Sequence, residues 1–191
     1  MSTIVVVKKD GVAAIAADTM TSGGAGRDSA LCIVNHSKLV RVRDSWLGIA
    51  GPTSAKAILA DYFSTLKGPV KLRNTTDILK VWLKLHKALK DKYFLESRND
   101  PDACFQSSAI DVLIANPAGI FGVTEHRTVQ EFSMFYSYGS GSHCALGAMF
   151  ALYHREGLSA VDIATAAVHA AAEFDDGTGL PLLVQTVQLV C

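Results

Sequence analysis

A serine stands at the second position of the chain, directly before a run of β-branched residues. An initiator methionine followed by a small residue is normally trimmed, so we expect Ser2 to become the N-terminus. A terminal serine carries both a nucleophilic hydroxyl and an α-amine, whose pKa is about 7.7–8.0. Such an amine can accept the hydroxyl proton near neutral pH, which predicts N-terminal nucleophile chemistry. On this feature alone, an ordinary frayed first residue is the simpler alternative.

A carboxylate and an ammonium stand at the ends of two further apolar segments. Asp18 closes the segment 12–18, where a charge without a partner is costly. Lys38 begins another segment and is the candidate partner, and such a pair beside a nucleophile tunes nearby pKa values. Gly51 follows a third segment, where an exposed backbone N–H can face an oxyanion. A strand-end ion pair and a plain turn are the alternatives.

Two glycine-containing clusters border predicted helices, namely Gly139-Ser140-Gly141 and Asp175-Asp176-Gly177-Thr178-Gly179. Their hydroxyls and carboxylate could orient an amine, and helix capping is the alternative interpretation. Neither cluster matches a dinucleotide-binding or P-loop motif, and the histidines and cysteines lack metal-ligand spacing.

The elements that must position these residues form runs of strands separated by helix pairs. Strands are expected at 3–9, 12–18, 31–34, 38–42, 46–50, 109–115, 119–124 and 180–190, with one or two more in 128–138. Helices are expected at 53–67, 74–98, 143–155 and 160–174. Because strands and helices do not alternate singly, the pattern favours two face-to-face sheets with helix pairs on their outer faces.

Composition narrows the function classes. The chain has 191 residues, which predicts a single domain over 1–191. Lys+Arg and Asp+Glu both number 18, so the balanced charge argues against nucleic acid or an anionic membrane as partner. No apolar run reaches the roughly 18 residues of a membrane span. The four cysteines are far apart and no export signal precedes them, which predicts reduced thiols and a cytoplasmic protein.

Taken together and in this order, the segments resemble the proteasome β-subunit and HslV family. The matching segments are Ser2–Gly11 with Ile15-Ala16-Ala17-Asp18, then Lys38–Val42, Ile49-Ala50-Gly51, Gly139-Ser140-Gly141-Ser142 and Asp175-x-x-Thr178-Gly179. The resemblance runs from residue 2 to about residue 190 and is strongest to the bacterial proteasome homologue related to HslV. It implies an α+β fold, the four-layer αββα sandwich of N-terminal nucleophile hydrolases.

The resemblance also implies roles for individual residues. Ser2 would be the nucleophile in place of the family's threonine, with Asp18 and Lys38 as catalytic partners and the Gly51 N–H as oxyanion donor. Ser140, Asp175 and Thr178 would orient the terminal amine. Substrate binding is implied at Thr21, Ser22, His36, Ile49 and Thr53. No cofactor is required, and a structural cation is implied at the backbone carbonyls of Ala172, Asp175 and Thr178.

Two departures from the family carry expectations of their own. Serine lacks the methyl group that restricts the side-chain rotamer of threonine, so we expect slower catalysis. The segment from Asp18 to Lys38 is longer than in HslV, with the extra residues at Gly23–Arg27. We hypothesise that this flexible, glycine-rich loop contacts substrate.

The function implied by the resemblance is that of a bacterial, self-compartmentalising endopeptidase. It would hydrolyse unfolded polypeptides inside a homo-oligomeric double ring of hexamers or heptamers. An ATP-dependent unfoldase is the implied partner, whereas no nucleic acid or membrane partner is expected. The alternatives are a catalytically inactive ring scaffold and a small-molecule amidase of the same nucleophile class. Particle size and reaction with an inhibitor specific for N-terminal nucleophiles separate the three.

Overall fold

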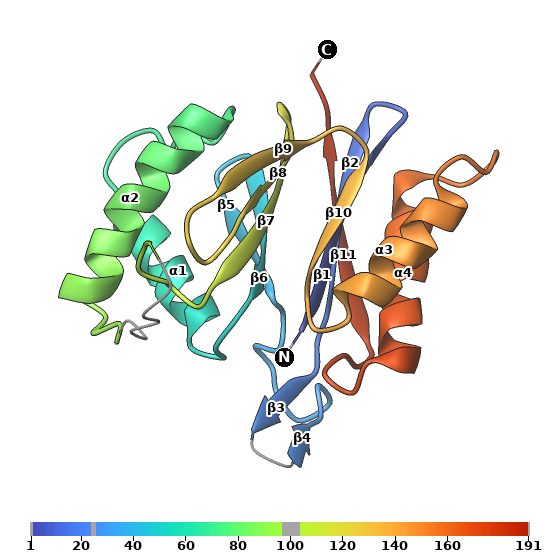
Figure 1. Cartoon of the computed structure of the whole chain (residues 1–191), viewed down its shortest axis with the longest axis horizontal. Helices are drawn as coiled ribbons and strands as arrows, with labels where there is room; N and C mark the ends of the chain where they lie inside the picture. Colours follow the sequence, from blue (N-terminus) through green and yellow to red (C-terminus); the bar gives the residue numbers. More distant parts are fainter. Residues whose placement is uncertain (1, 24–25, 97–103, 191) are drawn as a thin grey trace.

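The computed structural model describes residues 2–23, 26–96 and 104–190. Its elements follow in the predicted order (Figure 1). The strands are β1 (Thr3–Lys9), β2 (Val12–Asp18), β3 (Thr21–Gly23), β4 (Gly26–Asp28), β5 (Leu39–Val42), β6 (Ser45–Ala50), β7 (Asp111–Asn116), β8 (Gly119–Val123), β9 (Val129–Phe132), β10 (Phe135–Gly139) and β11 (Leu182–Gln188). The helices are α1 (Ala55–Thr65), α2 (Thr75–Asp91), α3 (Ser142–Leu152) and α4 (Ala160–Phe174).

Two antiparallel sheets lie face to face at the centre of the molecule (Figure 1). One has four strands in the order β10-β1-β2-β11, and the other has five in the order β5-β6-β7-β8-β9. The first strand is therefore paired on both sides, with Thr3 opposite Gly139 of β10 and Ile4 opposite Ala17 of β2. This pairing surrounds residue 2 with the ends of neighbouring strands.

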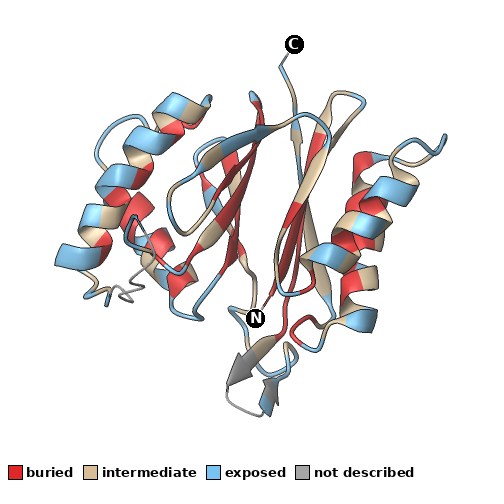
Figure 2. Cartoon of the chain, viewed as in Figure 1, coloured by how far each residue is buried: buried red, intermediate tan, exposed pale blue. Residues whose placement is uncertain are grey.

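Each sheet is buried on both faces, because a helix pair covers the face that the other sheet does not (Figure 2). Along β1, Ile4 and Val6 face the opposite sheet, whereas Val5 and Val7 pack against α3 and α4. This explains why consecutive residues of the strand are all fully buried. The helices α1 and α2 pack on the five-stranded sheet in a third apolar layer around Trp82. The predicted four-layer αββα sandwich is confirmed.

The helix α4 lies close to its sheet because alanines form its buried face. Ser159 caps its first turn through the backbone N–H of Asp162, and the Asp162 carboxylate accepts from the Ser159 N–H in return. This capping box agrees with the predicted start of the helix. The helix ends at Phe174, with Asp175 as its C-cap. Its C-terminus therefore delivers Asp175 to the same end of the sheets as residue 2.

The prediction of a strand over 31–34 is wrong. The structure has turns there, and Leu31 and Val34 are 93% and 101% exposed. A strand needs a neighbouring edge with which to form hydrogen bonds, and β5 starts only at Leu39. The glycine-rich loop expected at 23–27 overlaps the short antiparallel strands β3 and β4, in which Thr21 pairs with Asp28. Gly24 and Ala25 of the hypothesised substrate loop lie outside the described residues.

Helix limits differ from the predictions mainly at the end of α2. The predicted helix extends to Arg98, but α2 ends at Asp91. Phe94 has a φ of 55°, which takes the chain out of the helical conformation, and the Leu95 N–H bonds back to the Leu89 carbonyl at 2.9 Å. Arg98 itself lies outside the described residues. Among the helices of the described ranges, none is long and apolar enough to cross a membrane.

Candidate active site

The predicted site residues come from different elements that end at the same place. Ser2 precedes β1, Asp18 is the last residue of β2 and Lys38 directly precedes β5. Gly51 directly follows β6, and Ser140 directly follows β10. Antiparallel pairing places the start of β1 beside the ends of β2 and β10, and packing of the sheets brings β5 and β6 to them.

A largely buried ion pair lies at the centre of this group. The Lys38 ammonium donates to Asp18 Oδ1 at 2.7 Å, and the Asp18 side chain is 0% exposed. The backbone N–H of Thr3 donates to the same oxygen at 2.9 Å. The other oxygen, Oδ2, accepts from the N–H groups of Met20 and Gly179, both at 3.2 Å. The predicted partnership of Asp18 and Lys38 is therefore present, with three backbone donors fixing the carboxylate.

Burial lowers the pKa of the Lys38 ammonium. Desolvation is the largest cause, because it disfavours the charged form. The charge of Asp18 and its hydrogen bond act in the opposite direction, with a smaller contribution from the charge of Asp175. Lys38 is thus a desolvated cation held in place by a buried anion.

A second hydrogen-bonded group holds the other side of Ser2. The Ser140 N–H donates to the Ser2 carbonyl at 2.9 Å. The Ser140 hydroxyl donates to Asp175 Oδ2 at 2.7 Å, and the Thr178 hydroxyl donates to the same oxygen at 2.6 Å. The three residues predicted to orient the terminal amine therefore form one cluster next to Ser2.

The glycine at position 139 makes this approach possible. Its φ is 104°, and a Cβ atom there would overlap the Ser2 carbonyl oxygen. We expect Gly139→Ala to lower the free energy of unfolding by about 3 kcal/mol, through backbone strain and displacement of residue 2. The control is Gly147→Ala in α3, where a Cβ meets no atom within 4 Å, and where alanine should stabilise by about 0.5–1 kcal/mol. Chemical denaturation measures both, and equal effects would contradict the expectation.

A pocket of about 240 Å³ opens beside Ser2. Ser2, Lys38 and Gly51 line it together with four of the predicted substrate-binding residues, Thr21, His36, Ile49 and Thr53. The fifth, Ser22, lies in β3, and its side chain is outside the described part of the structure. At Gly51 a Cβ would come within 2.7 Å of the Ala109 carbonyl oxygen, so only glycine fits there. Because Gly51 lines the pocket, its backbone is accessible from it.

Sequence reasoning missed three residues of this region. Asp28 and Lys56 also line the pocket, and the Lys56 ammonium donates to the Asn35 carbonyl oxygen. Thr3 bonds to Asp18 through its N–H and to the Thr178 hydroxyl through its side chain. Alternation along β1 could have indicated that Thr3 does not share the orientation of Ile4. No sequence signal connects Thr3 to Thr178, because the contact depends on the turn after α4.

The implied cation site is made of backbone carbonyls near the end of α4. Ala172 lies in the last turn of α4, and Asp175 is the C-cap of that helix. The Asp175 carbonyl accepts the Thr178 N–H at 3.1 Å and keeps one lone pair. In the described ranges, no three His, Cys, Asp or Glu side chains could hold a metal ion together. Cation binding by the carbonyls remains a prediction.

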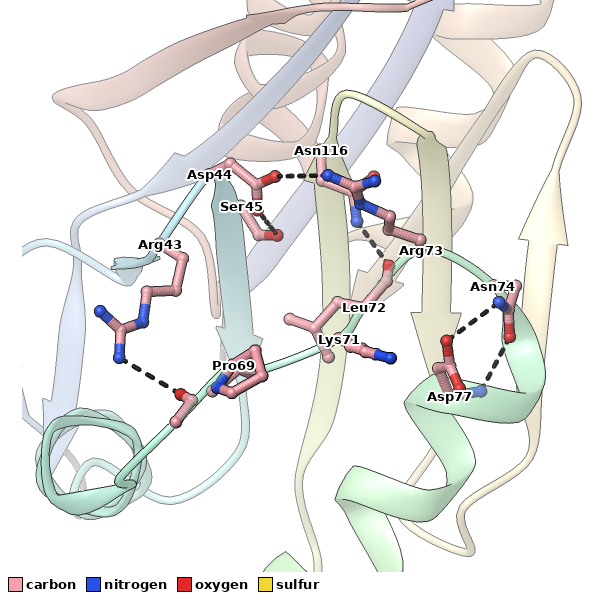
Figure 3. A pocket seen from close by; sticks show the side chains of 12 residues that line it. Arg43, Asp44, Ser45, Pro69, Lys71, Leu72, Arg73, Asn74, Asp77 and Asn116 are labelled. Carbon is pink, nitrogen blue, oxygen red and sulfur yellow. Dashed lines mark hydrogen bonds and ion pairs between the residues drawn. The ribbon is translucent and has the colours of Figure 1, made fainter.

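A larger hollow of about 820 Å³ lies beside the start of α2 (Figure 3). The turn between β5 and β6 and the segment before α2 form its walls. The Asn116 side chain donates to the Leu72 carbonyl at 2.6 Å and fixes that segment. None of the predicted site residues lines this hollow.

Comparison with solved structures places the chain in a family. BPH from Thiobacillus denitrificans in complex with epoxomicin is 50% identical, with a TM-score of 0.94 over 99% of this chain and 100% of that one. This chain belongs to the proteasome and HslV family. A second BPH structure from the same organism is also 50% identical, with a TM-score of 0.94 over 98% of both chains.

A distant member of the family has the same fold. HslV from Trypanosoma brucei is 19% identical, with a TM-score of 0.70 over 97% of this chain and 99% of that chain. The fold is thus that of the N-terminal nucleophile hydrolases, as predicted. No protein-family model matches the chain, and no curated protein matches its sequence.

Proposed function

We propose that this member of the proteasome and HslV family is an N-terminal nucleophile endopeptidase with Ser2 as nucleophile. The observation that carries the proposal is the convergence at residue 2. Ser2, Lys38 and Gly51 line one pocket, and the bonds of Asp18 and Ser140 hold the backbone of residues 2 and 3 from two sides. Removal of Met1 is part of the proposal, because it frees the α-amine of Ser2.

The proposed reaction begins with attack of the Ser2 hydroxyl oxygen on the carbonyl carbon of a peptide bond. The α-amine takes the hydroxyl proton, directly or through water, and the Lys38 charge favours this deprotonation. The Gly51 N–H donates to the developing oxyanion. The C–N bond then breaks, and the amine of Ser2 passes the proton to the leaving amine. Water hydrolyses the resulting ester, returning the hydroxyl and releasing the new carboxyl end.

The relative's ligand supports this chemistry. Epoxomicin, which is bound in the BPH structure that is 50% identical to this chain, is an epoxyketone. Epoxyketones form their ring adduct only with a residue that offers both a hydroxyl and a free α-amine. A terminal serine has both groups, as a terminal threonine does.

The assembly and its substrates are proposed from the family resemblance. The subunits would form a homo-oligomeric double ring of hexamers or heptamers with the sites facing an inner chamber. Unfolded polypeptides would be the substrates, because a closed chamber excludes folded proteins. An ATP-dependent unfoldase is the proposed partner and the bacterial cytoplasm the proposed compartment. The described cysteines Cys32, Cys104 and Cys144 are free thiols, which is consistent with a reducing compartment.

Intact-mass spectrometry before and after epoxomicin treatment tests the proposal. We expect loss of Met1 and one adduct per chain, and no adduct for Ser2→Ala. Native mass spectrometry of the same sample gives the particle size. A large particle that forms no adduct would favour the inactive scaffold, and an active monomer or dimer would favour the amidase.

Restoring the family's threonine provides a finer test. Ser2→Thr adds a methyl group that restricts the side-chain rotamer, so the hydroxyl spends more time in the reactive position. We expect kcat for a fluorogenic peptide to rise about twofold to fivefold, corresponding to about 0.5–1 kcal/mol of side-chain entropy. An equal or lower kcat, after mass spectrometry has verified Met1 removal, would contradict this explanation.

A further inference from the structure

Thr3 connects the two halves of the candidate site. Its side chain is 0% exposed at the start of β1. Its N–H donates to Asp18 Oδ1, which also accepts the Lys38 ammonium. Its hydroxyl lies 2.6 Å from the Thr178 hydroxyl. One residue therefore contacts both the buried ion pair and the cluster around Asp175.

The protons of this cluster fix the direction of the bond between the two threonines. The Thr178 hydroxyl has one proton, and its oxygen lies 2.6 Å from Asp175 Oδ2, the carboxylate oxygen to which it donates. The Thr178 oxygen must then accept in its contact with Thr3. The Thr3 hydroxyl is consequently the donor at the start of a chain that runs through Thr178 to Asp175.

The surrounding backbone is shaped around this hydroxyl. A Cβ at Gly141 would overlap Thr3 Oγ1 and would come within 3.0 Å of Thr178 Oγ1. The same Cβ would lie 2.8 Å from the Ala171 side chain in α4. The contact between Thr3 and Thr178 therefore depends on glycine at position 141.

We infer that Thr3 is a positioning residue for the nucleophile, acting through its hydroxyl. This inference rests on the proposed function of Ser2. Thr3 has two anchors, its N–H on Asp18 and its hydroxyl on Thr178. Together they fix the backbone next to Ser2 relative to Lys38 and Asp175. Loss of the hydroxyl anchor removes the side-chain link from residue 3 to the cluster around Asp175, so the Ser2 hydroxyl and amine occupy a wider range of positions. A misplacement of about 1 Å in a reacting group can cost about a hundredfold in rate.

Two variants separate the hydroxyl from the shape of Thr3. Thr3→Val keeps the branched shape and loses the hydroxyl, whereas Thr3→Ser keeps the hydroxyl and loses a methyl group. We expect Thr3→Val to lower kcat and the rate of epoxomicin labelling about 10-fold to 100-fold, with KM changed less than about threefold. Thr3→Ser should retain activity to within about threefold. Mass spectrometry of every variant checks that Met1 is removed.

The reverse ranking would overturn the inference, because a packing role predicts that Thr3→Ser is the damaged variant. Equal losses in both variants would overturn it too. If the natural chain forms no epoxomicin adduct and cleaves no peptide, the proposed function fails, and a stability cycle decides whether the link exists.

The cycle compares Thr3→Val, Thr178→Val and the double variant by chemical denaturation. Because one hydrogen bond is worth about 1 kcal/mol, the two substitutions should couple by about fivefold in the unfolding equilibrium. Additive effects would show that the two hydroxyls do not stabilise each other.

Discussion

Replacement of Lys38 by methionine is expected to lower kcat for a fluorogenic peptide by about a thousandfold, or about 4 kcal/mol of transition-state stabilisation. Methionine keeps the apolar stem of the largely buried lysine side chain but removes the charge that faces the pocket of Ser2. The Asp18 carboxylate keeps the N–H groups of Thr3, Met20 and Gly179 as donors. The variant should therefore fold, with a loss of stability from the unpaired Asp18 carboxylate, and the loss of activity should appear in the chemical step.

The second lysine of the pocket provides a matched control. Lys56 donates to the Asn35 carbonyl, and its charge lies in the wall of the same pocket. We expect Lys56→Met to raise KM a few-fold and to retain most of kcat. Steady-state kinetics on particles of the natural size measure both variants. Comparable losses of kcat would contradict a specific role of Lys38 at Ser2.

The sequence predicts those parts of the site that depend on local pattern. Asp18 and Lys38 stand at the ends of apolar segments, and a charge in such a place needs a partner. The structure pairs them at 2.7 Å. Likewise, a glycine directly before Ser140 is typical of a tight turn into a helix, and Gly139 has the positive φ of such a turn. In these cases the residue type itself, a charge in an apolar segment or a glycine at a turn, indicates which conformation is favourable.

Other parts depend on contacts that the sequence does not encode locally. The donors to Asp18 Oδ2 are backbone N–H groups, which every residue except proline possesses. The turn at 31–34 contains residues typical of strands, yet these residues pair with none of the described strands. The link between Thr3 and Thr178 joins positions at opposite ends of the chain. Tertiary geometry, rather than propensity, determines all three.

Asp18→Asn is expected to destabilise the protein by about 3–5 kcal/mol, the cost typical of removing one partner of a buried ion pair. Each carboxylate oxygen of Asp18 accepts two donors. Asparagine offers one oxygen, so its NH₂ group must face two donors in either orientation. Lys38 also becomes a buried cation without its anion. Chemical denaturation measures the loss, and a change below about 1 kcal/mol would contradict the buried pair.

The same substitution should move the pH dependence of catalysis in a defined direction. Burial lowers the pKa of Lys38, and Asp18 opposes that effect through its charge and hydrogen bond. Without Asp18 the pKa of Lys38 falls further, so Lys38 loses its proton at lower pH. The alkaline limb of kcat against pH should therefore shift to lower pH.

The pH dependence of stability should change as well. In the folded natural protein Lys38 binds a proton less tightly than in the unfolded chain. The contribution of Lys38 to the free energy of unfolding therefore rises with pH from its lowered folded-state pKa up to 10.5, the value in the unfolded chain. In Asp18→Asn this rise should begin at lower pH.

Asp28, an aspartate that lines the pocket, provides the control for this shift. Asp28→Asn removes a carboxylate charge from the pocket lining, whereas the ion pair of Lys38, at 2.7 Å, is with Asp18. Its alkaline limb should coincide with that of the natural protein. Kinetics between about pH 6 and pH 10 compare the three proteins. If the alkaline limbs of Asp18→Asn and Asp28→Asn coincided, the charge of Lys38 would not govern the rate, because of these two carboxylates it is Asp18 that bonds directly to Lys38.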